Sequence, residues 1–166
     1  MTYRDLSDLL DYHYWARDRA LSAVERLTPD QITQDLGNSF GSIEDTLTHL
    51  YAADWIWCSR WQGESPRAMP SSDAFSDLAS LRAAWSKHER VVRSVLEGFG
   101  PDGVESVVVY RTTEGTEDRT VFWHMLQHVV NHASYHRGQI TTMLRQLDAQ
   151  VPDSMDLITY YRDRKR

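Results

Sequence analysis

The chain has 166 residues, enough for one sizeable hydrophobic core, and a formal net charge of −6 from 24 acidic and 18 basic residues. Its basic residues cluster only at the extreme C-terminus, 162–166, so it lacks the basic patch of a nucleic-acid-binding surface. No stretch approaches the roughly 18 apolar residues of a membrane span or forms the apolar region of a signal peptide. We therefore expect one cytoplasmic domain over residues 1–166, with neither a nucleic acid nor a membrane as partner.

Apolar residues recur at spacings of three and four along four long stretches, which predicts helices over residues 3–27, 42–62, 75–98 and 120–147. Breaks rich in Gly and Pro separate them, and the segment 28–41 is predicted to be a loop. The β-branched run Val107–Val109, with turn residues at 113–116, predicts a short β-hairpin before the last long helix. Residues 154–161 are predicted to form one or two helical turns. The pattern predicts an all-α four-helix bundle with a hairpin insertion.

The single cysteine, Cys58, lies in the second predicted helix between Trp57 and Ser59. It cannot form an internal disulfide, which agrees with a reducing compartment. No neighbour in the sequence suggests a lowered thiol pKa, so we interpret Cys58 as a buried, unreactive thiol.

Four histidines recur at every fourth position of the last long predicted helix, namely His124, His128, His132 and His136. Side chains four apart on a helix have Cβ atoms roughly 5–6 Å apart, close enough for two imidazoles to bind one metal ion. Each step of four residues also drifts roughly 40° around the helix, so the four rings cannot be equal ligands. The pattern predicts a transition-metal site, because zinc, nickel, iron and copper all accept neutral imidazole.

Only two of these histidines are predicted to point inward. Relative to the centre of the apolar face, His136 lies about 25° away, His132 about 65°, His128 about 105° and His124 about 145°. A buried pair of imidazoles without partners would be costly to desolvate, which favours metal ligation of His132 and His136 over simple packing without a metal. We expect His124 to be a surface residue and His128 to support a ligand imidazole or replace one. The apolar face consists of Phe122, Met125, Val129, Ala133, Ile140, Met143 and Leu147.

A third ligand must come from another helix, because a catalytic zinc site usually has three protein ligands and one open position. His49 is the predicted ligand, since it follows the helix start at Ser42 and lies on the flank of an apolar face. His13 lies on the apolar stripe of the first helix, and we interpret it as core packing first and a reserve ligand second. His88 lies among Lys87, Glu89 and Arg90, and it is predicted to lie on a solvated face with no role in the site.

A metal held by three neutral imidazoles would leave one position for water or a thiolate. His128 or Gln139 could then orient a ligand imidazole or relay a proton. Asp54 and Trp57, which follow His49 in the second helix, could line the pocket, although a salt bridge and core packing explain them equally well.

The run Val129–Ile140, with its His-Ala-Ser-Tyr-His-Arg-Gly-Gln core, resembles the signature of the DinB family of metal-binding bundles. The segments Tyr14–Ala16, Phe40–Ile43 with His49, and Asp156–Tyr160 are also similar to that family. The resemblance implies a four-helix bundle with a long connection, a homodimer, and a divalent metal held by His49, His132 and His136.

The resemblance also suggests an activity, because the wider superfamily includes isomerases and transferases that use low-molecular-weight thiols such as mycothiol or bacillithiol. We therefore expect a metal-dependent enzyme, a thiol-dependent transferase or isomerase, or else a hydrolase, acting on a small electrophilic molecule with zinc, nickel or iron. The alternative is a bundle that binds or senses a metal without turnover, and a fourth protein ligand would favour it. Arg137 gives no support to the sulfoxide synthases of the superfamily, which lack that motif.

Overall fold

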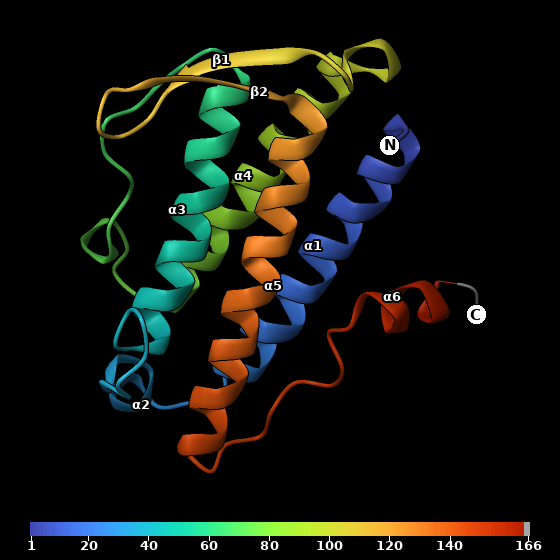
Figure 1. The fold of residues 1–166 in the computed structure, drawn as a ribbon. Helices are drawn as coiled ribbons and strands as arrows, with labels where there is room; N and C mark the ends of the chain where they lie inside the picture. The colour runs from blue at the N-terminus through green and yellow to red at the C-terminus, as the bar shows by residue number, and fades with distance from the viewer. Residues whose placement is uncertain (165–166) are drawn as a thin grey trace.

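The computed structural model describes residues 1–164, in which four long helices form a bundle (Figure 1). They are α1 (Tyr3–Val24), α3 (Ile43–Trp61), α4 (Leu78–Phe99) and α5 (Phe122–Gln146). Helices α1 and α3 each pack against both α4 and α5. The predicted four-helix bundle is therefore confirmed. Across residues 1–164, we find no helix with the length and apolar character that a membrane crossing requires.

The connections contain shorter elements. They are the short helices α2 (Pro29–Thr33) and α6 (Leu157–Asp163) and two 3₁₀ turns, at Ser72–Ala74 and Pro101–Gly103. The prediction of a loop over residues 28–41 was wrong where α2 forms. Thr28 accepts a hydrogen bond from the backbone of Gln31, whose side chain accepts one from the backbone of Thr28, and this reciprocal cap stabilises a helix too short for periodicity to reveal.

The predicted hairpin is present and covers one end of the bundle (Figure 1). Strand β1 (Val107–Arg111) pairs antiparallel with β2 (Glu117–Val121), and α5 begins at the residue after β2. Val108 and Tyr110 are buried, and β1 contacts α3. The Tyr110 ring lies 5.5 Å from that of Trp57 in an edge-to-face arrangement, so the hairpin is fixed against the C-terminal half of α3.

Helix α3 begins as predicted at Ser42, whose hydroxyl oxygen accepts a hydrogen bond from the backbone N–H of Asp45 at 3.0 Å. Cys58, farther along this helix, is fully buried, and burial raises its pKa to about 12. The interpretation of Cys58 as a buried thiol is confirmed, and at neutral pH it stays protonated.

The prediction for His88 was wrong, because its side chain is only 9% exposed. It lies on the buried face of α4 between Trp85 and Val92, and its ring is 5.8 Å from that of Tyr51. The charged residues on either side of it in the sequence lie on other faces of the helix, and they masked an apolar spacing of three and four.

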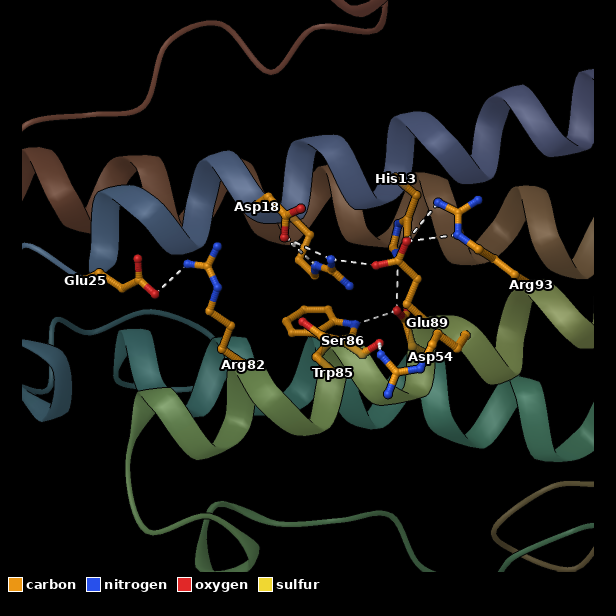
Figure 2. A network of polar contacts seen from close by, with 11 residues as sticks. His13, Asp18, Glu25, Asp54, Arg82, Trp85, Ser86, Glu89 and Arg93 are labelled. Atoms are coloured by element: carbon orange, nitrogen blue, oxygen red, sulfur yellow. Dashed lines mark hydrogen bonds and ion pairs between the residues drawn. The ribbon is translucent and has the colours of Figure 1, made fainter.

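A buried carboxylate joins three of the long helices (Figure 2). Asp54 of α3, only 3% exposed, lies 3.0 Å from His13 Nε2 of α1 and accepts a hydrogen bond of 2.8 Å from Trp85 Nε1 of α4. Burial by itself would raise the pKa of Asp54, but the His13 ring and these hydrogen bonds outweigh it and lower the pKa. The sequence allowed Asp54 either to line the pocket or to form a salt bridge. Its contact with His13 corresponds to the salt bridge.

We expect Asp54→Ala to lower the free energy of unfolding by about 3 kcal/mol, because it leaves His13 and Trp85 buried without their partner. Urea denaturation at pH 7 with a chelator present measures the change. Asp18→Ala is the matched control, since Asp18 is 50% exposed and its removal from Arg17 is expected to cost less than about 1 kcal/mol. Equal losses in the two variants would contradict this role for Asp54.

Candidate metal centre

Three histidines from two helices converge at one point between α3 and α5. His49 Nε2 lies 3.1 Å from His132 Nε2, and His132 Nε2 lies 3.0 Å from His136 Nε2. All three ligand nitrogens lie within 4.8 Å of one another. The rings meet edge to face, with centroids 4.5–5.0 Å apart, so their Nε2 atoms point to a common centre. The structure thus brings together the three histidines that the sequence selected.

Two of the three separations between these nitrogens are close to those of a metal-ligand set. Three nitrogens about 2.0–2.1 Å from a tetrahedral zinc ion would be separated by roughly 3.3–3.4 Å. The two shorter separations lie a few tenths of an ångström below that value. Within residues 1–164, no fourth His, Cys, Asp or Glu atom joins the group. Three protein donors without a fourth are the set that a catalytic zinc site usually has.

The hydrogen bond to Gln139 fixes the tautomer of His136. His136 Nδ1 lies 2.6 Å from Gln139 Oε1, and because an amide oxygen only accepts, Nδ1 must carry the proton. The lone pair of the neutral ring is then on Nε2, which points toward the other two histidines. Gln139 Nε2 in turn donates to Ser39 Oγ at 2.9 Å, so the amide is held in this orientation. The predicted role of Gln139 in orienting a ligand imidazole agrees with this geometry.

The loop before α3 covers the outer side of the cluster. The Phe40 ring stacks on that of His49 with centroids 4.0 Å apart, and it meets the His136 ring edge-on at 5.4 Å. Gly41 adopts a φ of +76°, a left-handed conformation that glycine tolerates and that turns the chain from Phe40 into the cap of α3. Ser39 and Phe40 support the cluster through these contacts, and periodicity alone did not identify them, since both lie in a loop.

Two of the histidines are held in the neutral form. Burial, together with the neighbouring His136, lowers the pKa of His49 to about 4. Burial also lowers the pKa of His132 to about 4, with further contributions from His136, His49 and His128. At pH 7 both rings therefore carry no proton on one nitrogen, which is the state that metal ligation requires.

The other predicted candidates lie outside the cluster. His124 is exposed, as expected. His128 is also exposed, and its ring stacks 5.7 Å from that of His132 without joining the cluster. His13 is fully buried with its Nε2 on Asp54, so its predicted core position is confirmed, whereas its second interpretation as a reserve ligand finds no support. Asp54 is likewise engaged in the bundle core and does not line the pocket.

A pocket of about 200 Å³ opens beside His49 and His132. Trp57 lies on its wall, as the sequence suggested, and so does Arg60, which sequence analysis missed. A signal for Arg60 exists, since it follows His49 by eleven residues and therefore lies on the same side of a helix. The lining residues are His49, Ala53, Ile56, Trp57, Arg60, Met69, Thr113, His128 and His132.

Comparison with known proteins identifies the family of the chain. The sequence profile of the DinB family matches residues 1–163. The chain belongs to the DinB family. It is also similar to the protein DinB of Bacillus subtilis (strain 168), with 24% identity over 143 residues that cover 83% of each chain. The resemblance drawn from the histidine motif is thus confirmed over nearly the full length of this DinB-family chain.

The lowered pKa values make the stability of the metal-free protein depend on pH. Between pH 6.5 and 4 the unfolded chain protonates His49 and His132 while the folded chain does not, so stability is lost as the pH falls through this range. We expect the loss between pH 7 and 5 to be about 1–2 kcal/mol smaller in a His49→Asn, His132→Asn double variant, after allowance for solvent screening. Urea titrations with a chelator measure it, and identical pH profiles for the two proteins would refute the effect.

Proposed function

We propose that this DinB-family protein is a metal-dependent enzyme that transfers or isomerises a small electrophilic molecule with the help of a low-molecular-weight thiol. The observation that carries the proposal is the convergence of three Nε2 atoms beside an open pocket. The ligands we propose are His49, His132 and His136, and the ion is zinc, nickel or iron. The homodimer and the cytoplasmic location expected from the sequence remain predictions.

The residues present fit a divalent transition metal. Two of the three imidazoles are neutral at pH 7, and the Gln139 contact directs the lone pair of His136 inward. When bound, such an ion favours the deprotonated form of a thiol or a water molecule at neutral pH. The amide of Gln139 and the ring of Phe40 hold two of the ligands in place from outside.

The chain supplies the surroundings of the reaction. Ala53, Ile56 and Trp57 give the pocket an apolar wall. His128, one helical turn before His132, also lines the pocket, where its ring lies 5.2 Å from that of Trp57, and partial desolvation lowers its pKa. Its neutral ring is available at pH 7 to accept the proton that a thiol releases on entering the pocket. The open side of the cluster favours turnover over the alternative, a bundle that binds or senses a metal.

Purified protein is expected to contain about one divalent transition metal per chain. A His132→Ala, His136→Ala double variant is expected to lose it, because a single imidazole cannot retain the ion. His124→Ala is the control, since it removes an exposed histidine from the same helix and is expected to keep the metal. Elemental analysis after gel filtration measures the content, and an equal amount of metal in all three proteins would reject the site.

Thiol binding separates the enzyme from its alternative. In the cobalt-substituted protein, mycothiol, bacillithiol or a simple alkanethiol is expected to produce a sulfur-to-cobalt charge-transfer band, because a thiolate occupies the open position. Thiol consumption with a panel of small electrophiles then tests turnover. A protein that binds metal would be a binding or sensing module if the cobalt form shows no band and the zinc, nickel and iron forms consume no thiol.

A further inference from the structure

We propose that the pocket beside the three histidines takes a small molecule with an anionic group, and that Arg60 binds that group. This inference rests on the proposed metal-dependent function, since it concerns the molecule that reaches the same pocket. The substrate class is small molecules that carry a compact anion such as a carboxylate, and Arg60 is the residue that selects them.

Arg60 is a buried cation without a polar partner from its own chain. Its side chain is only 7% exposed, and its Nε is fully buried with no hydrogen-bond partner. None of the ion pairs or side-chain hydrogen bonds formed within residues 1–164 involves its guanidinium. Burial lowers the pKa of Arg60 and the carboxylate of Glu114 raises it, but this carboxylate accepts its side-chain hydrogen bond from Thr113. A buried guanidinium costs free energy unless its donors are satisfied, so these donors are suited to a ligand.

The other two buried arginines show how this chain satisfies such a group. Arg17 pairs with the carboxylates of Asp18 and Glu89. Arg137 donates to Ser134 Oγ at 2.9 Å and contacts the Tyr12 hydroxyl. The Arg60 guanidinium instead contacts the rings of Trp57 and Tyr110, and Arg60 differs from both in lining the pocket that contains two of the three histidines.

Aromatic rings hold the guanidinium in place. Its central carbon lies 4.6 Å from the ring centre of Trp57 and 5.0 Å from that of Tyr110. These cation–π contacts favour the charged form and orient the planar group without using its N–H donors. A planar guanidinium fixed in this way matches the geometry of a carboxylate, which can accept two parallel hydrogen bonds.

His49 and Arg60 line the pocket from the same side of α3. Eleven residues separate them, a rise of roughly 16 Å along the helix axis, but the Arg60 guanidinium lies nearer to His49 than that, over the ring of Trp57 one turn earlier. Between them lie Ala53 and Ile56, which offer only apolar contact. The volume of about 200 Å³ is below the roughly 300–1,000 Å³ typical of sites for drug-sized ligands. The pocket therefore suits a slender molecule with a metal-binding atom at one end and an anion at the other.

The test uses ω-mercaptocarboxylates of three, six and eight carbons, each paired with the mercaptoalcohol of equal length. Calorimetric titration of the zinc-loaded protein is expected to show that the carboxylate of at least one length binds about tenfold or more tightly than its alcohol. Arg60→Gln is expected to abolish this difference and Arg60→Lys to retain part of it. Arg67→Gln, which removes an exposed arginine from a nearby loop, is the control for net charge. Melting temperatures and zinc contents verify that the variants fold and load.

A second measurement does not depend on the metal. In chelator-treated protein, hexanoate is expected to shift the Nε–Hε NMR resonance of Arg60, assigned by its absence in Arg60→Lys, whereas hexanol is not. A larger shift of the same resonance with methylphosphonate than with hexanoate would indicate a preference for phosphate-like anions over carboxylates.

The outcomes separate this inference from the proposed function. Zinc and mercaptoalcohol binding without any preference for the anion, together with an unshifted Arg60 resonance, would overturn the role of Arg60 and leave the metal centre intact. A shift of the Arg60 resonance in a protein that binds no zinc would support the anion site while the proposed function fails. A preference for the anion that persists in Arg60→Gln would also overturn the inference.

Discussion

The packing of α3 against α5 is the constraint on which the site depends. Leu47 and Leu50 of α3 and Val129 and Ile140 of α5 are buried in the core, and the three histidines lie between these apolar residues in the sequence. Burial of the apolar side chains therefore sets the height and rotation of both helices. The positions of the three imidazoles are fixed as a result. A ligand set built on two packed helices is more rigid than one built on loops.

Helix α3 separates its polar groups by direction. Asp54 faces α1 and α4, where His13 and Trp85 satisfy its carboxylate, whereas His49 faces α5. This separation has a chemical consequence, because a free carboxylate in the cluster would add a fourth, anionic ligand and close the open position. The salt bridge in the core and the three-histidine cluster are thus complementary features of one helix.

The sequence predicted the parts of the molecule that follow helical periodicity. His132 and His136 were identified because their angle to the apolar face can be calculated from 3.6 residues per turn. His88 was misassigned because its charged neighbours in the sequence concealed the same periodicity. The contacts of Phe40 with His49, and of Arg60 with Tyr110, could not be predicted, because they depend on where a loop and a hairpin lie in three dimensions.

The hairpin links the fold to the selectivity proposed for the pocket. Tyr110 of β1 packs on Trp57 and contributes one of the two rings that hold Arg60, while Thr113 in the turn between the strands lies at the pocket itself. The three-histidine cluster is supplied by the bundle, whereas one of the two rings that contact Arg60 is supplied by this insertion. Changes in the hairpin can therefore alter the surroundings of Arg60 without disturbing the three histidines, because these lie on α3 and α5.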